Sequence, residues 1–416
     1  MNNIFENLKY NEYYILFNNL PLFLTSILGI YFICYKIFLY FFKNNNNNIY
    51  KSNQKININN NNNNTLNLSF PISNILNLMN NTPLIYIKSL SKLTGFNIYA
   101  KCEYLLPFTS KDRVIKNIII QAQKNGQLTK NSVIYEGSSG STGYSVANIS
   151  RLFGYKCVIV IPDDCSKEKI NLLKTTGCKL IITKQCPFSN FKDNYIRLAK
   201  KLSNQDENGF YIDQFFNPIN YITHYNETGP EIYNQLNGKI DCFVSAGGTG
   251  GTIKGISKYL KERNPNCLCV LADINGSGMY EYVKNGVMYT KEESEANRKK
   301  ERYYSKIEGI GINFLSDNFK EILCDEAYKV RDDEAIFMGK YILDNEGLFI
   351  GGSSAVNFVT IYKMFLDKEN NKIKNIKKNS NIVTVIYDNG IKYLDKLYDE
   401  EIIKNCSVKN IEDIKL

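Results

Sequence analysis

Strand-like and helix-like segments alternate along most of this chain, and that alternation restricts its fold more than any other feature. Short runs rich in Val, Ile and Tyr are separated by stretches with helical spacing of apolar residues. A strand, a crossover helix and another strand at such intervals favour a parallel sheet. The sequence therefore predicts an α/β fold with mostly parallel sheets. The expected strands are residues 132–135, 157–161, 180–183, 242–245, 268–272 and 382–386, and the expected helices are 144–153, 167–176 and 253–262.

The N-terminal part of the chain does not share this alternation. Residues 20–42 are almost entirely apolar and long enough to cross a bilayer, and Lys36 lies near the end of the run, where it can snorkel to the interface. The lysines that follow the run favour a cytosolic location for the rest of the chain. We expect a single-pass membrane anchor over residues 1–43, with a buried core helix as the alternative. Residues 44–66 are rich in Asn and are expected to form a disordered linker.

The charge and the rare residue types exclude several kinds of function. The net charge is +10, but the lysines are scattered and no basic-aromatic motif appears, so we do not expect nucleic-acid binding. The eleven cysteines form no CxxC pair, and His224 is the only histidine, so we expect no metal site and no Ser-His-Asp triad.

Residues 247–252, GGTGGT, follow one predicted strand and precede a predicted helix. Glycines allow a tight turn and a close approach to a ligand, and the free N–H groups of the next helix attract anions. The segment therefore indicates a phosphate site, although a plain glycine-rich turn would have the same composition. It lacks the lysine of a P-loop and the acidic residue of a dinucleotide fingerprint.

Residues 137–143, GSSGSTG, also lie between a predicted strand and a predicted helix. Hydroxyls and free N–H groups at a helix start suit a carboxylate, although an ordinary hydroxyl-rich helix cap is equally compatible.

Two further short segments indicate little when each is taken alone. Lys111, in the run Ser110-Lys111-Asp112-Arg113, can form a Schiff base if its surroundings keep the amine partly unprotonated. Residues 351–354, GGSS, offer hydroxyls that could reach a ring nitrogen.

Taken in order along the chain, these segments resemble the cysteine synthase and cystathionine β-synthase family of fold-type II pyridoxal phosphate (PLP) enzymes. The resemblance covers roughly residues 70–400 and is strongest to a "cysteine synthase 2" subgroup of lower eukaryotes, some of which look anchored at mitochondria. It implies two three-layer lobes with PLP between them, a smaller lobe at about 112–220 inserted into a larger one, a catalytic region over 67–405, a tail over 406–416, and a homodimer. The segments that carry it are residues 81–83, 110–113, 137–143, 213–218, 228–231, 247–252, 271–278, 307–311 and 351–354.

The resemblance also implies a role for individual residues. Lys111 matches the Schiff-base lysine, and Ser353 matches the serine that bonds the pyridine nitrogen. The cofactor's phosphate loop is matched by Gly248, Thr249, Gly250, Gly251 and Thr252, and Ser141 stands where the family usually has an Asn facing the ring oxygen. The residues expected to bind the substrate are Ser138, Ser139, Thr142, Gln214 and Gly309.

The reaction implied is β-replacement, in which O-acetylserine loses acetate and sulfide or another thiol takes its place. Two alternatives stay open: cystathionine synthesis, deamination or desulfuration on the same fold, and a catalytically weak membrane-tethered protein. Phe108 and Thr109 replace small residues in a turn that is one residue shorter than usual, immediately before Lys111. The implied location is a membrane, such as the mitochondrial outer membrane, with the catalytic region facing the cytosol.

Overall fold

A computed structural model describes residues 72–138, 140–184, 194–290, 305–370 and 376–416. The expected anchor (1–43) and linker (44–66) lie outside these residues, as does Ser139. Within the described ranges, no helix combines the length and the apolar character needed to cross a membrane.

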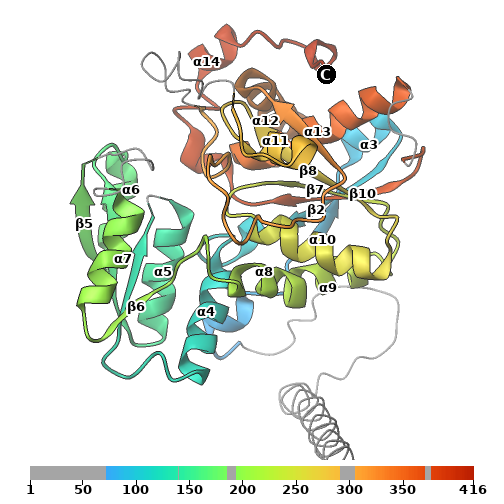
Figure 1. The fold of residues 1–416 in the computed structure, drawn as a ribbon. Coiled ribbons are helices and arrows are strands. Elements are labelled where there is room, and N and C mark those ends of the chain that lie inside the picture. The colour runs from blue at the N-terminus through green and yellow to red at the C-terminus, as the bar shows by residue number, and fades with distance from the viewer. Residues whose placement is uncertain (1–71, 139, 185–193, 291–304, 371–375) are drawn as a thin grey trace, which may run out of the picture. The chain divides into compact units, whose positions relative to one another are not determined.

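The larger sheet has six strands in the order β1-β2-β10-β7-β8-β9 (Figure 1). Only β1 runs antiparallel to its neighbour, and the other pairs are parallel, as the alternation predicted. The strands are β1 (Leu84–Tyr86), β2 (Asn97–Cys102), β7 (Cys242–Ala246), β8 (Leu268–Ile274), β9 (Glu326–Val330) and β10 (Asn381–Ile386).

Helices cover both faces of the larger sheet. One face packs against α3 (Lys88–Thr94), α12 (Asp332–Glu346) and α13 (Gly352–Glu369), and the other packs against α9 (Gly229–Gln235), α10 (Gly251–Arg263) and α11 (Met279–Asn285). β8 is buried along its whole length because apolar residues lie on both faces. The result is a three-layer arrangement.

The smaller sheet has four parallel strands in the order β5-β4-β3-β6, and its residues fall between β2 and β7 in the chain. α4, α5 and α6 share one core with its strands, and α7 packs directly on β3, where a Cβ on Gly137 would lie 2.6 Å from Ile196 Cα. The elements are β3 (Val133–Gly137), β4 (Lys156–Pro162), β5 (Lys179–Thr183), β6 (Gly209–Tyr211), α4 (Asp112–Lys124), α5 (Ser141–Leu152), α6 (Lys167–Thr175) and α7 (Tyr195–Gln205).

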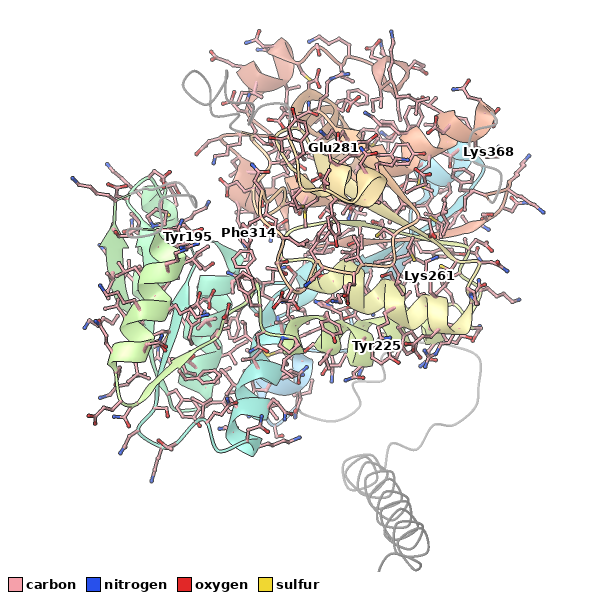
Figure 2. The ribbon with its side chains drawn as sticks, viewed as in Figure 1. Tyr195, Tyr225, Lys261, Glu281, Phe314 and Lys368 are labelled. Carbon is pink, nitrogen blue, oxygen red and sulfur yellow. The ribbon has the colours of Figure 1, made fainter. Side chains whose placement is uncertain are left out.

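The segment after β6 returns to the larger lobe through α8 (Ile219–Thr223) and the π-helical turn His224–Thr228. Phe314 of the larger lobe packs against this return, with its ring centroid 5.1 Å from that of Phe215 and 6.3 Å from that of Phe216. Figure 2 shows Phe314 at the edge of the larger lobe that faces the smaller one.

The last eleven residues pack on the larger lobe. After α14 (Glu400–Asn405), the chain buries Cys406, Val408, Ile411 and Ile414 in the same core as α12 and α13. Residues 406–416 are therefore part of the packed structure of the larger lobe, since four of their apolar side chains are buried in its core.

Candidate active site

Lys111 lies immediately before the first residue of α4, where its backbone N–H donates to Thr109 Oγ1 at 3.0 Å. Desolvation lowers the pKa of the Lys111 ammonium, and the carboxylates of Asp388 and Glu103 oppose that shift without reversing it. An amine with a lowered pKa spends more time unprotonated and is a better nucleophile. The buried position therefore favours the unprotonated Lys111 amine, which is the form that reacts with an aldehyde to give a Schiff base.

A buried charge network holds the start of α4. The Arg113 side chain is fully buried, and it donates to Glu103 Oε2 at 2.7 Å and to Glu231 Oε1 at 2.6 Å. Burial lowers the pKa of Arg113, but the two carboxylates outweigh it and the net direction is upward. Lys101, also fully buried, pairs with Glu231 at 2.7 Å. Removing one member of such a network leaves a buried charge unpaired, so the network fixes the place at which Lys111 emerges.

The loop between β7 and α10 has no room for side chains at three of its glycines. A Cβ on Gly248 would lie 2.4 Å from the Gly309 carbonyl oxygen, and one on Gly251 would lie 1.9 Å from Asn220 Oδ1. Gly250 has φ +90° and would clash with Phe319. The loop is a tight cradle at the N-terminus of α10, a thirteen-residue helix whose free N–H groups suit an anion.

Polar groups from other segments support this loop. Asn220 Nδ2 donates to Thr249 Oγ1 at 3.0 Å, and Ser316 Oγ donates to the Thr249 carbonyl at 2.8 Å. The sequence analysis gave neither residue a role, because each lies outside the recognisable motifs.

His224 is a further residue that sequence reasoning missed. Its Nε2 lies 3.2 Å from Thr252 Oγ1, and its Nδ1 lies 2.9 Å from Thr228 Oγ1. Burial, and then the positive charges of Lys111 and Arg113, hold the pKa of His224 well below its usual value. The imidazole is therefore neutral and ties the GGTGGT loop to the π-helical turn. No sequence motif marks His224. In the structure it begins a π-helical turn, and such turns often mark functional sites.

The GSSGSTG segment forms the N-terminus of α5, as expected. Thr142 Oγ1 donates to Gln214 Oε1 at 2.7 Å, and Gln214 Nε2 donates to Glu136 Oε1 at 3.1 Å. Ser138 is buried, and a Cβ on Gly143 would lie 2.6 Å from its carbonyl oxygen. Burial, and then the charge of Asp213, raise the pKa of Glu136 well above its usual value. The contact between Thr142 and Gln214 joins two residues that the family resemblance assigned to the substrate.

The unusual turn before Lys111 is bonded to this second loop. Thr109 Oγ1 lies 2.6 Å from Ser145 Oγ and donates to the Ser141 carbonyl at 3.3 Å. Ser145 Oγ in turn donates to Asp112 Oδ1 at 2.5 Å, and Asp112 accepts the backbone N–H groups of Phe108 and Thr109. Thr109 thus replaces a small residue and gains a role, because its hydroxyl connects the lysine turn to α5.

The remaining expected residues lie at the ends of the larger sheet. Ser353 is buried in the first turn of α13, and a Cβ on Gly351 would lie 2.0 Å from Asp388 Oδ1. Gly309 has φ +80° and packs on Gly248. The charge of Asp388 raises the pKa of Lys111, and the charge of Lys111 lowers the pKa of His224.

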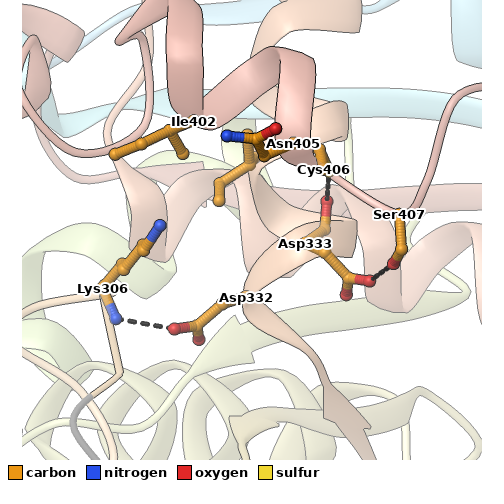
Figure 3. Close-up of a pocket in the computed structure, with 8 residues that line it drawn as sticks. Lys306, Asp332, Asp333, Ile402, Asn405, Cys406 and Ser407 are labelled. Atoms are coloured by element: carbon orange, nitrogen blue, oxygen red, sulfur yellow. Dashed lines mark hydrogen bonds between the residues drawn. The ribbon is translucent and has the colours of Figure 1, made fainter.

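A separate hollow is drawn in Figure 3. It is lined by Lys306, Asp332, Asp333, Ile336, Ile402, Asn405, Cys406 and Ser407, and none of the site residues expected from the sequence is among them. Within the described ranges, no group of His, Cys, Asp or Glu side chains is arranged to hold a metal ion.

A family model described as pyridoxal-phosphate dependent enzyme matches residues 75–388. The chain belongs to this family. Cysteine synthase 2 of Schizosaccharomyces pombe is 39% identical over 349 residues, which cover 81% of this chain and 86% of that protein. Cysteine synthase of Dictyostelium discoideum is 40% identical over 333 residues, covering 79% and 85%. These matches confirm the cysteine synthase and cystathionine β-synthase group expected from the motifs.

Two further relatives add detail. A Saccharomyces cerevisiae protein whose name contains "mitochondrial cysteine synthase" is 41% identical over 365 residues, covering 84% of this chain and 90% of that protein. The crystal structure of an O-acetylserine dependent cystathionine β-synthase from Helicobacter pylori matches with a TM-score of 0.67 and 27% identity, covering 79% of this chain and 98% of that one.

The residues present fit the cofactor of this family. PLP combines a phosphate, an aldehyde and a pyridine ring. The glycine cradle at α10 suits the phosphate, Lys111 suits the aldehyde, and the buried Ser353 hydroxyl suits the ring nitrogen.

Proposed function

We propose that this protein is a PLP-dependent enzyme that converts O-acetylserine and sulfide into L-cysteine and acetate. The observation that carries the proposal is the hydrogen-bonded connection of the Lys111 turn to two anion loops. Thr109 joins Lys111 to α5, and Gln214 and Asn220 join Thr142 of α5 to Thr249 of the GGTGGT loop. The relatives from S. pombe and D. discoideum, both named cysteine synthases, support the choice of reaction.

We assign the cofactor-binding roles to Lys111, Ser141, Ser353 and the loop from Gly248 to Thr252. When bound, PLP withdraws electrons from the substrate Cα. Lys111 would hold the cofactor through its aldehyde, and Lys111 Nζ would accept the proton that leaves Cα. The neutral hydroxyl of Ser353 does not hold the ring nitrogen protonated as a carboxylate would, which favours prompt loss of the β-substituent.

We assign the substrate carboxylate to the N-terminus of α5, with the hydroxyls of Ser138 and Ser139 and the backbone N–H of Thr142 as donors. The Thr142 hydroxyl donates to Gln214, which in turn donates to Glu136, so this pair of hydrogen bonds holds the first turn of α5 in place. Gly309, whose carbonyl contacts Gly248, borders the space for the reacting part of the substrate.

Purified full-length protein reconstituted with PLP tests the proposal. The wild type should absorb visible light through the cofactor linked to Lys111, and Lys111→Ala should lose both that linkage and cysteine formation. The wild type should form cysteine from O-acetylserine and sulfide, whereas PLP loading without turnover of O-acetylserine would refute the reaction. Lys258→Ala, which removes an exposed lysine paired with Glu262 on α10, is the matched lysine control and should retain both properties.

The name of the H. pylori structure favours one second candidate, cystathionine synthesis from O-acetylserine. Replacing sulfide by homocysteine in the same assay separates the two reactions. A higher kcat/KM with homocysteine would make cystathionine the product.

We further propose that residues 20–42 anchor the enzyme in the mitochondrial outer membrane, with the catalytic region in the cytosol. We also propose that the enzyme forms a homodimer. The apolar run and the name of the S. cerevisiae relative support the first part. Complete release by alkaline carbonate extraction would refute the anchor. A monomer in light scattering of detergent-purified protein would refute the dimer.

A further inference from the structure

Lys392 lies on a turn of the larger lobe that reaches the substrate loop of the smaller lobe. The turn Gly390–Tyr393 follows β10, and its N-cap Asn389 accepts the Ile391 N–H at 3.2 Å. Tyr393 is buried and donates to Asp388 Oδ2 at 2.6 Å, which holds the turn to the end of β10. From this held turn the Lys392 ammonium donates to Ser141 Oγ at 3.5 Å, across a sequence separation of 251 residues.

The neighbours of Lys392 place its charge at the site. Ser141 is the first residue of α5, next to Thr142, which bonds Gln214. On the other side, Asp388 interacts electrostatically with both Lys392 and Lys111. Lys392 therefore has Ser141, at the N-terminus of α5, on one side and Asp388, whose charge also acts on Lys111, on the other.

The Lys392 charge is also less compensated than those of comparable lysines. Lys169 and Lys396 both pair with Glu308, whereas no carboxylate in the described part of the chain lies within ion-pair distance of the Lys392 ammonium. Asp388 has one oxygen bonded by Tyr393 and the other buried without a hydrogen-bond partner among the described residues. A cation beside a helix N-terminus creates an attractive position for a carboxylate.

We propose that Lys392 is a substrate-recognition residue that binds the α-carboxylate of the incoming amino acid together with the N-terminus of α5. This inference rests on the proposed function. The exposed ammonium swings from Ser141 Oγ to the carboxylate, so it adds affinity for an amino acid with a free carboxylate and little for a neutral analogue.

The test is steady-state kinetics on the PLP-loaded full-length enzyme with Lys392→Met, Lys392→Arg and, as control, the exposed Lys404→Met. We expect Lys392→Met to raise the KM for O-acetylserine about three- to tenfold with kcat within about twofold, as for loss of a partly exposed charge pair. Lys392→Arg should restore KM to within about twofold, because it keeps the charge. Lys404→Met should leave both constants unchanged.

A neutral analogue separates recognition from a structural effect. The carboxamide of O-acetylserine lacks the negative charge. Lys392→Met should therefore raise the KM for the acid and leave the KM for the amide unchanged. An unchanged KM for the acid, or equal losses for acid and amide, would overturn the inference. If the wild type does not turn over O-acetylserine, the proposed reaction fails instead. The same comparison is then made with L-serine and L-serinamide through the change in cofactor absorbance on binding, with the same two outcomes.

Discussion

At the scale of single residues, the chemistry depends on how the surroundings set the charge of a few side chains. Desolvation lowers the pKa of Lys111, while the carboxylates of Asp388 and Glu103 act in the opposite direction. The balance leaves a nucleophilic amine that still has a carboxylate near it. His224 is held neutral by the same surroundings. It can therefore accept a hydrogen bond from Thr252 or donate one to it, according to its tautomer, without adding charge.

The first prediction concerns the pH dependence of cofactor capture. The rate at which apoenzyme binds PLP should rise with pH, because the neutral amine reacts, and should level off below the ordinary lysine pKa of about 10.4. Asp388→Asn removes a group that raises the Lys111 pKa, so the midpoint should move to lower pH. Stopped-flow absorbance measures both profiles. A midpoint that does not move would show that the Asp388 charge does not reach Lys111.

The second prediction concerns His224. His224→Phe keeps a planar ring but removes the bond to Thr252, so the Kd for PLP should rise about tenfold, the effect of losing one buried polar contact of about 1.4 kcal/mol. Equilibrium titration of apoenzyme gives this value. Tyr225→Phe, next to it in sequence, loses hydroxyl contacts with Glu262 and Arg263 on α10 and none with Thr252, so it serves as the control. Equal affinities in wild type and His224→Phe would contradict the support role.

At the scale of elements, hydrogen bonds between segments that are separate in the chain hold the helix N-termini of the site. Thr109 connects the turn before α4 to α5, and His224 connects the π-turn to α10. The fit of the β7–α10 loop is steric, since its glycines touch atoms from distant segments.

The third prediction tests that steric fit. Gly248→Ala would place a methyl group 2.4 Å from the Gly309 carbonyl oxygen, so the loop must shift and PLP affinity should fall at least about tenfold. Gly339→Ala in α12 is the control, because its added methyl meets only the end of the Tyr398 side chain, at 3.1 Å. Thermal denaturation with and without PLP should show that the Gly248 variant loses stabilisation by the cofactor. Full retention of that stabilisation would contradict the cradle.

At the scale of the whole molecule, Glu308 joins segments that are far apart in the chain. It pairs with Lys169 on α6 of the smaller lobe and with Lys396 of the larger lobe, and it directly precedes Gly309. Burial raises the pKa of Glu308, but the two lysines outweigh that effect and the net pKa is lowered.

The fourth prediction follows from that pair of bridges. A carboxyl group with a lowered pKa contributes stability above its unfolded pKa and loses it as pH falls through the folded value. Glu308→Gln should therefore lower Tm by about 2 °C at about pH 6–8, and the difference should shrink below about pH 4.3. Because these side chains are between 31% and 45% exposed, salt at about 1 M should also reduce the difference. An unchanged Tm would show that the bridges contribute nothing measurable.

The sequence alone determined the α/β class, the parallel pairing and the order of the motifs, because these depend on local periodicity and on short segments with fixed chemistry. β4 and α6 lie within one residue of their expected bounds for this reason. The family and its cofactor followed from the order of those segments. Thr142 and Gln214, both assigned to the substrate from the resemblance, are hydrogen-bonded to each other. The tertiary structure alone decided which unmarked side chains join the site. His224, Asn220, Asp388 and Lys392 come from segments distant from their partners, and their roles depend on burial, distance and charge after folding. The packing of residues 406–416 has the same origin, since an apolar end is a tail or a core segment according to the surface that the rest of the chain presents.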